Sequence, residues 1–72
     1  MFRFSRKKIL PLFLAMKITV AEFSRRAGIS FSAAERALNG RPVGGNIIGK
    51  VADALGIEPL DYLDTAAQGG GI

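Results

Sequence analysis

The lysines and arginines of this sequence are numerous and close together, as in a surface that binds an anion. The 72 residues include ten lysines and arginines, six aspartates and glutamates, and neither cysteine nor histidine. The two absences exclude disulfides, zinc sites of the Cys/His type, a cysteine nucleophile and the commonest general base. The acids are scattered and no base adjoins a nucleophile, so we expect no enzyme activity, no metal and no cofactor.

The cations are concentrated in one part of the chain. All ten lie within residues 1–51, where Glu22 and Glu35 are the only acids, so ten minus two leaves a net charge of +8. Residues 52–72 carry four acids and no base, a net charge of −4. This asymmetry indicates one surface that binds a polyanion. The alternative is an accidental asymmetry in a short chain.

The length of the chain allows one domain with a thin core. A domain of this size buries roughly 60% of the surface that its unfolded chain exposes. Small domains often gain stability from a disulfide, a metal or a second subunit. Because the first two are excluded here, we expect the domain to gain stability by forming a homodimer.

The N-terminus combines a basic segment with an apolar run from Ile9 to Met16. The pattern superficially resembles a signal peptide, but the run is short, contains Pro11 and ends at Lys17. It is also too short to span a bilayer, which needs about 20 residues. We therefore predict that residues 1–9 are a basic arm or the start of an amphipathic first helix, in a cytoplasmic protein without a membrane partner. A start at Met16 stays open as an alternative.

The next helix is marked at both ends. Thr19 and Glu22 form a T-x-x-E capping box, in which hydroxyl and carboxylate satisfy backbone N–H groups at a helix start. The box predicts a helix over about residues 20–27, and Gly28 ends it because glycine tolerates the positive φ found just past a helix.

A third helix follows after a tight turn. Ser30 is placed to cap it, and Asn39 with Gly40 ends it at about residue 39, after which Pro42 prevents continuation. Its apolar inner face consists of Ala34, Ala37 and Leu38.

The rest of the chain predicts one further helix of ordinary length and one short helix. Asn46 is placed to cap a helix that stops at Gly56. Pro59 suits the first turn of a short fifth helix, in which Leu60 and Leu63 face inward.

No segment shows sustained period-two alternation, so the predicted fold class is all-α, a compact bundle of four to five helices. Two short helices joined by a glycine-containing turn predict a helix-turn-helix within a domain of residues 10–65. Residues 66–72 contain three consecutive glycines and are predicted to be a flexible tail.

Two stretches resemble known DNA-binding families. The sequence ITVAEFSRRAGIS at residues 18–30, followed by ALNGRPV at 37–43, resembles the DNA-binding headpiece of lactose-repressor-type regulators. The sequence VADALGIEPLDYL at residues 51–63 resembles the closing helices of Cro-like, phage-repressor-type domains. Both families share the lambda-repressor-like fold, so the resemblance implies a DNA-binding regulator.

Three positions depart from the pattern of Cro-like domains. Val20 stands where these domains usually open the second helix with a phosphate-binding glutamine. Ser24 replaces a usual alanine, and Ala34 replaces a β-branched residue that commonly anchors the recognition helix. These departures concern docking on DNA rather than the fold.

In such a motif the second helix enters the major groove with its early residues at the base edges. The face opposite its apolar side carries the candidate base-reading residues. Arg36 suits guanine, Ser32 several bases, Glu35 cytosine N4, and Phe31 a thymine methyl. Each has an alternative: Arg36 a solvated side chain, Glu35 the second half of a Ser32–Glu35 capping box, and Phe31 a core or turn-packing residue.

Other polar residues are candidates for the phosphate backbone, where contacts orient a protein without reading sequence. Those within the bundle are Lys17, Thr19, Arg25, Arg26, Asn39, Arg41, Asn46 and Lys50. The candidates in the N-terminal arm are Arg3, Arg6, Lys7 and Lys8.

The sequence favours a homodimeric regulator of double-stranded DNA, of the phage or mobile-element kind, without a small-molecule effector domain. The acidic C-terminal third is the candidate dimer surface, with Leu60, Tyr62 and Leu63. Alternatively these side chains close the core of the monomer. Two other functions stay open: an antitoxin-like or adaptor module that binds a regulatory protein partner, and a membrane-surface peptide led by Met1–Met16.

Overall fold

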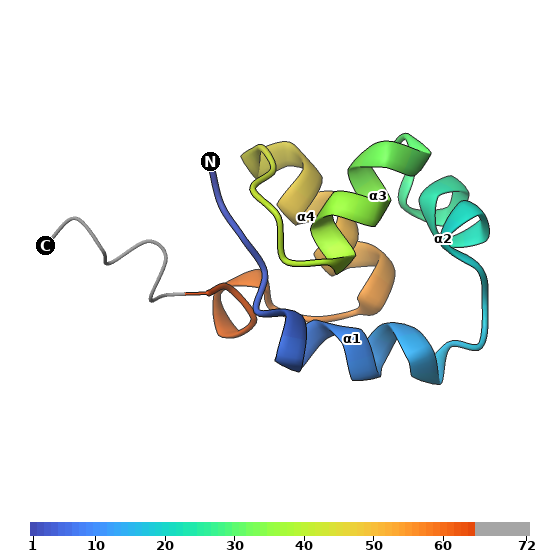
Figure 1. The fold of residues 1–72 in the computed structure, drawn as a ribbon, viewed down its shortest axis with the longest axis horizontal. Helices are drawn as coiled ribbons and strands as arrows, with labels where there is room; N and C mark the ends of the chain where they lie inside the picture. Colours follow the sequence, from blue (N-terminus) through green and yellow to red (C-terminus); the bar gives the residue numbers. More distant parts are fainter. Residues whose placement is uncertain (65–72) are drawn as a thin grey trace, which may run out of the picture.

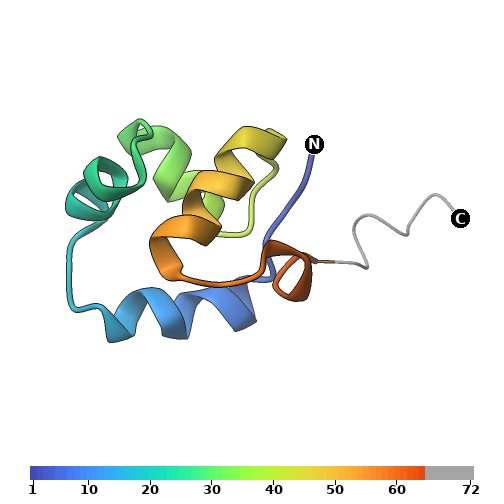
Figure 2. The same cartoon turned by 180° about the vertical axis from the view of Figure 1, so that it is seen from behind.

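The computed structural model describes residues 1–64, and these residues contain no strand, so the predicted all-α class is confirmed. The elements are α1 (Arg6–Ala15), α2 (Val20–Ala27), α3 (Phe31–Leu38), α4 (Gly45–Leu55) and the 3-10 turn η1 (Pro59–Asp61). In Figures 1 and 2, α1 runs along one edge of the bundle, while α2 and α3 lie along the opposite edge. The predicted tail at residues 66–72 lies outside the described part of the chain.

The predicted hydroxyl caps at the start of α2 and α3 are confirmed, whereas the carboxylate of Glu22, the other half of the predicted box, pairs with Arg26 at 3.7 Å. The Oγ1 atom of Thr19 accepts a hydrogen bond from the Glu22 amide at 3.1 Å. The Oγ atom of Ser30 accepts one from the Ala33 amide at 3.1 Å. Each bond satisfies one of the amides that a helix start leaves without a partner. The bounds of α2 are those predicted, and α3 ends one residue earlier than expected.

Two predictions for the second half of the chain are wrong. Asn46 does not cap α4, because the carbonyl of Gly44 already accepts the amides of Ile47 and Ile48, both at 3.1 Å. The helix thus starts one residue before Asn46. The expected short fifth helix is present as a 3-10 turn of three residues with Pro59 in its first turn, and Leu63 is buried as expected, but Leu60 is 73% exposed rather than turned inward.

The N-terminal segment is built into the bundle. Helix α1 begins at Arg6 and continues through Pro11. Before it, Phe2 exchanges two backbone hydrogen bonds with Val43, at 2.9 and 2.8 Å. On the other side of the segment, the Ser5 amide donates to the carbonyl of Tyr62 at 2.7 Å, and the Asp64 amide donates to that of Arg3 at 2.7 Å. Residues 2–5 therefore connect the loop after α3 with the segment after η1.

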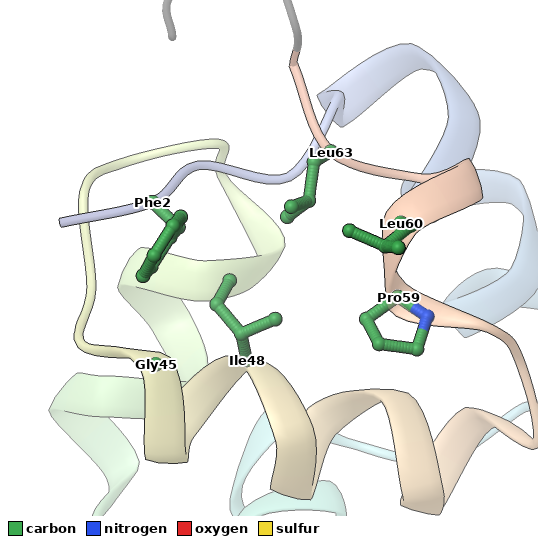
Figure 3. A pocket seen from close by; sticks show the side chains of 6 residues that line it. All are labelled: Phe2, Gly45, Ile48, Pro59, Leu60 and Leu63. Atoms are coloured by element: carbon green, nitrogen blue, oxygen red, sulfur yellow. The ribbon is translucent and has the colours of Figure 1, made fainter.

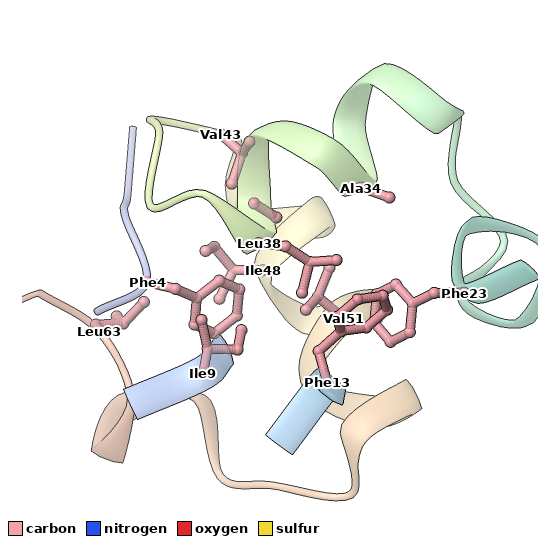
Figure 4. Packing of buried hydrophobic residues seen from close by; sticks show 11 residues of the cluster. Phe4, Ile9, Phe13, Phe23, Ala34, Leu38, Val43, Ile48, Val51 and Leu63 are labelled. Atoms are coloured by element: carbon pink, nitrogen blue, oxygen red, sulfur yellow. The ribbon is translucent and has the colours of Figure 1, made fainter. Parts of the chain in front are cut away.

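The core joins the N-terminal segment and all four helices (Figure 4). Phe4, Ile9 and Phe13 enter it from the first 15 residues, with exposed fractions of 1%, 0% and 7%. The rings of Phe13 and Phe23 meet edge to face, with centroids 5.6 Å apart and an interplanar angle of 83°. Such aromatic pairs stabilise beyond the area they bury, by about 0.5–1.5 kcal/mol. Much of the apolar run in residues 9–16 is thus used to hold α1 against the other helices.

Candidate nucleic-acid interface

The turn between α2 and α3 has a fixed geometry. Gly28 has φ 72° and ψ 36°, in the left-handed region that glycine adopts most easily. The Ile29 amide donates to the carbonyl of Ser24 at 3.0 Å, and the Gly28 amide donates to that of Arg25 at 3.2 Å. This pair of bonds is a Schellman motif, which satisfies the last carbonyls of α2. Ser30 then caps α3, so the turn between the two helices consists of Gly28, Ile29 and Ser30. These three residues set the angle between α2 and α3.

Helix α3 has one buried face and one exposed face. Ala34, Ala37 and Leu38 are at most 3% exposed, so they hold the helix on the core. The opposite face carries the four predicted base-reading residues, all of them exposed: Phe31, Ser32, Glu35 and Arg36. Phe31 is 50% exposed and does not belong to the core. A Ser32–Glu35 capping box is excluded because Ser30 is the cap and Ser32 lies within the helix.

The end of α3 forms a polar hollow of about 530 Å³, lined by Glu35, Arg36, Asn39 and Arg41. Within it, the guanidinium of Arg36 donates to the carbonyl of Pro42 at 3.2 Å. The amide of Asn39 donates to the carbonyl of Glu35 at 2.8 Å. Two arginines, Arg36 and Arg41, thus line one open hollow beside α3. Guanidinium groups are well suited to phosphate oxygens, with which they form charge-assisted hydrogen bonds.

The other predicted backbone contacts are all exposed, but they do not form one cluster. Arg25 and Arg26 lie in the last turn of α2, and Arg26 is 3.7 Å from the carboxylate of Glu22. This ion pair is exposed and contributes little to stability. Lys17 lies between α1 and α2 with a φ of 56°. Lys50 lies on α4.

Two basic residues of the predicted arm have contacts with different elements. The ammonium of Lys8 donates to the carbonyl of Asp61 at 3.3 Å, so it points toward η1. Arg6 instead lies beside Gly40 at the end of α3, since a Cβ added to Gly40 would be 3.4 Å from the Cβ of Arg6. Arg6 and Lys8 therefore lie beside different elements, Arg6 beside the end of α3 and Lys8 beside η1.

The three departures from the Cro-like pattern have local consequences. Ser24 is buried, at 6% exposed, and its hydroxyl donates to the carbonyl of Ala21 at 2.7 Å, so burial leaves no polar group unpaired. Val20 is half-buried and packs against the core. Ala34 is fully buried, so α3 is anchored at this position by a methyl group.

Sequence reasoning missed an apolar hollow of about 220 Å³ between the start of α4 and η1 (Figure 3). Its lining consists of Phe2, Gly45, Ile48, Pro59, Leu60 and Leu63. Of the residues expected at a dimer surface, Leu63 is 7% exposed and closes the core, Tyr62 is half-buried, and Leu60 is exposed. The alternation of aromatic and polar residues in Phe2-Arg3-Phe4-Ser5 is the signal that indicates the extended segment behind this hollow.

Comparison with protein families identifies the family to which this chain belongs. Residues 8–68 match the family model of the Cro/C1-type HTH DNA-binding domain. The chain belongs to this family. The predicted resemblance to Cro-like domains is confirmed, and DNA is the partner of this Cro/C1-type domain. No curated protein and no solved structure gives a significant match. Among residues 1–64 of the Cro/C1-type domain, no helix has the length and apolarity needed to cross a membrane.

Proposed function

We propose that this Cro/C1-type domain is a transcriptional regulator that recognises a specific sequence of double-stranded DNA, with α3 in the major groove. The observation that carries the proposal is the division of α3 into two faces. One face consists of Ala34, Ala37 and Leu38 and is buried. The other face consists of Phe31, Ser32, Glu35 and Arg36 and is exposed. A helix held in this way can insert its N-terminal residues between the phosphate backbones.

The exposed side chains have the chemistry of direct readout. Arg36 is suited to the O6 and N7 acceptors of guanine, and Glu35 to the N4 donor of cytosine. Ser32 can donate to or accept from several bases, while the exposed ring of Phe31 can contact a thymine methyl. In this proposal Arg36 exchanges its hydrogen bond with the Pro42 carbonyl for a bond to a base.

Phosphate contacts surround this face. Arg41 and Asn39 line the hollow at the end of α3, and Arg25 lies at the end of α2. Lys17, Thr19, Arg26, Asn46 and Lys50 complete the proposed set, together with Arg6 beside Gly40. If each subunit neutralises about four phosphates, the logarithm of a dimer's affinity falls against the logarithm of salt concentration with a slope of about −7.

The functional unit in this proposal is a homodimer on a palindromic operator. A single module of this size makes a small footprint on DNA, and regulators with a helix-turn-helix bind paired half-sites about one helical turn apart. Two copies of α3 related by a two-fold axis therefore read a two-fold symmetric sequence.

The test is selection from a pool of randomised DNA duplexes by the purified protein at about 0.15 M salt. We expect enrichment of a motif with two inverted half-sites. Enrichment of no sequence, with binding that depends only on salt, would contradict the proposal of specific recognition.

A further inference from the structure

The loop between α3 and α4 carries one of the proposed phosphate contacts. Arg41 is exposed on this loop and lines the polar hollow at the end of α3. Residues 41–44 belong to no helix, so contacts with other segments hold them in place. One such contact comes from α3, where the Arg41 amide donates to the carbonyl of Arg36 at 2.9 Å. The position of the Arg41 side chain therefore depends on what else holds the loop.

The N-terminal segment touches the loop at its start, near its end and at the helix that follows. The carbonyl oxygen of Phe4 lies so close to Gly40 that a Cβ added there would be 3.2 Å from it. Phe2 exchanges backbone hydrogen bonds with Val43, at 2.9 and 2.8 Å. The ring of Phe2 also lies beside Gly45 at the start of α4, where an added Cβ would be 3.5 Å from the ring (Figure 3). One short segment thus fixes the whole course of the loop.

This segment is itself anchored on the side away from the loop. Phe4 is 1% exposed and belongs to the core. The Ser5 amide donates to the carbonyl of Tyr62, and the Asp64 amide donates to that of Arg3, both at 2.7 Å. The loop is therefore tied to the core of the domain as well as to the end of α3.

We propose that Phe2 is a positioning residue for DNA binding, which through its pairing with Val43 holds Arg41 in place for a phosphate. This inference rests on the proposed function and deepens it, because it gives a role in DNA binding to a residue that does not touch DNA. A cation on an ordered loop loses little conformational entropy when it binds a phosphate. The same cation on an unpaired loop has to be ordered by the DNA, and the affinity is lower.

A role of Phe2 in stability alone would have different consequences. The ring is 41% exposed and lines the apolar hollow with Ile48, so it contributes buried apolar surface in either case. A residue that only stabilises the fold changes neither the DNA affinity of the folded molecules nor the number of phosphates that they contact. Energetic coupling between Phe2 and Arg41 in DNA binding is specific to the positioning role.

The test is a double-mutant cycle of Phe2→Ala and Arg41→Ala, with a DNA duplex of random sequence as the probe. Affinity is measured over a series of salt concentrations at which circular dichroism shows each variant to be folded. We expect each single variant to weaken binding about 5-fold, and the double variant to weaken it little further. The salt slope should fall by about one unit per subunit for Arg41→Ala, and by no more than that for Phe2→Ala. Phe2→Leu keeps part of the apolar contact and should show the same coupling at a smaller size.

Two matched variants serve as controls. Leu60→Ala removes an apolar side chain from the opposite side of the same hollow, and Arg25→Ala removes a proposed phosphate contact on α2. Neither residue lies on the N-terminal segment or on the loop. The losses of Leu60→Ala and Arg41→Ala should therefore add, as should those of Phe2→Ala and Arg25→Ala.

Additive losses for Phe2→Ala and Arg41→Ala would overturn the inference, as would wild-type affinity in folded Phe2→Ala. Hydrogen exchange in the free protein supplies a readout without DNA. In Phe2→Ala the Val43 amide should exchange at least about 10-fold faster, and an unchanged rate would also overturn the inference. A wild type that binds no duplex even at low salt would contradict the proposed function and the inference together, whereas a wild type that binds, with an additive cycle, would contradict the inference alone.

Discussion

The guanidinium of Arg36 is hydrogen-bonded to the carbonyl oxygen of Pro42, 3.2 Å away, across the loop that follows α3. The contact connects the exposed face of the helix with the loop that leads to α4. The same loop is held from the other side by Phe2, which pairs with Val43. The N-terminal segment, the loop and the end of α3 are thus connected by hydrogen bonds.

The cap of α3 allows a direct test of its start. Ser30→Ala removes the acceptor of the Ala33 amide and should lower the free energy of unfolding by about 1 kcal/mol. Ser32→Ala is the matched control, because Ser32 lies inside the helix and is exposed. Urea denaturation of both variants measures the difference. A larger loss for Ser32→Ala would indicate that α3 starts at a different residue.

A glycine inside α4 offers a gain in stability. A Cβ added to Gly49 has no atom within 4 Å, so Gly49→Ala should raise the free energy of unfolding by about 1 kcal/mol. The contrasting variant is Gly40→Ala, which has a φ of 73° and places its Cβ 3.2 Å from the carbonyl oxygen of Phe4. It should be destabilising. Thermal melts of the two variants should therefore shift in opposite directions, and shifts in the same direction would contradict the packing around residues 2–5.

Lys17 allows the contributions to stability and to DNA binding to be separated. Its φ of 56° lies in the left-handed region, which costs a residue with a Cβ about 1–2 kcal/mol. Lys17→Gly, and less strongly Lys17→Asn, should therefore raise stability by about 0.5–1 kcal/mol. If Lys17 contacts a phosphate, both variants should also lower the salt dependence of DNA binding by about one unit of slope per subunit. An unchanged slope would remove Lys17 from the interface, and a loss of stability would contradict its backbone conformation.

A chain that starts at Met16 should not fold. It lacks Phe4, Ile9 and Phe13, which are buried in the core. Loss of large buried side chains costs about 2–5 kcal/mol each, and small domains have only about 5–15 kcal/mol of stability in total. We expect no cooperative thermal transition in circular dichroism of this shortened chain. A cooperative transition like that of the full chain would show that α1 is dispensable.

Capping residues explain why α2 and α3 could be predicted from the sequence. Thr19, Gly28 and Ser30 act on the backbone within three or four residues, so their effect is local and visible in the sequence. The buried face of α3 could also be predicted, because the spacing of its apolar residues along the helix is visible in the sequence. The candidate site on the opposite face followed from the same period, and its contact with DNA stays a prediction.

What could not be predicted depends on contacts between distant residues. Phe2 pairs with Val43 and Phe4 with Leu63, so the extended segment before α1 is stabilised by partners about 40 and 60 residues away. Asn46 has a residue type suited to a cap, but the residue at the cap position is Gly44, whose carbonyl accepts the first amides of α4. Leu60 and Leu63 are of one type and three residues apart, and only the path of the chain after α4 places Leu63 inside and Leu60 outside.

The central claim is that α3 reads bases and that the surrounding cations bind phosphates. The most direct measurement compares the affinities of the wild type, Arg36→Ala and Arg25→Ala for the selected DNA site and for every single-base change in it. We expect Arg36→Ala to lose about 1–3 kcal/mol at one base pair in each half-site and to bind all bases there equally. Arg25→Ala should weaken binding to every sequence by the same factor. Equal weakening of all sequences by both variants would contradict the assignment of Arg36 to a base edge.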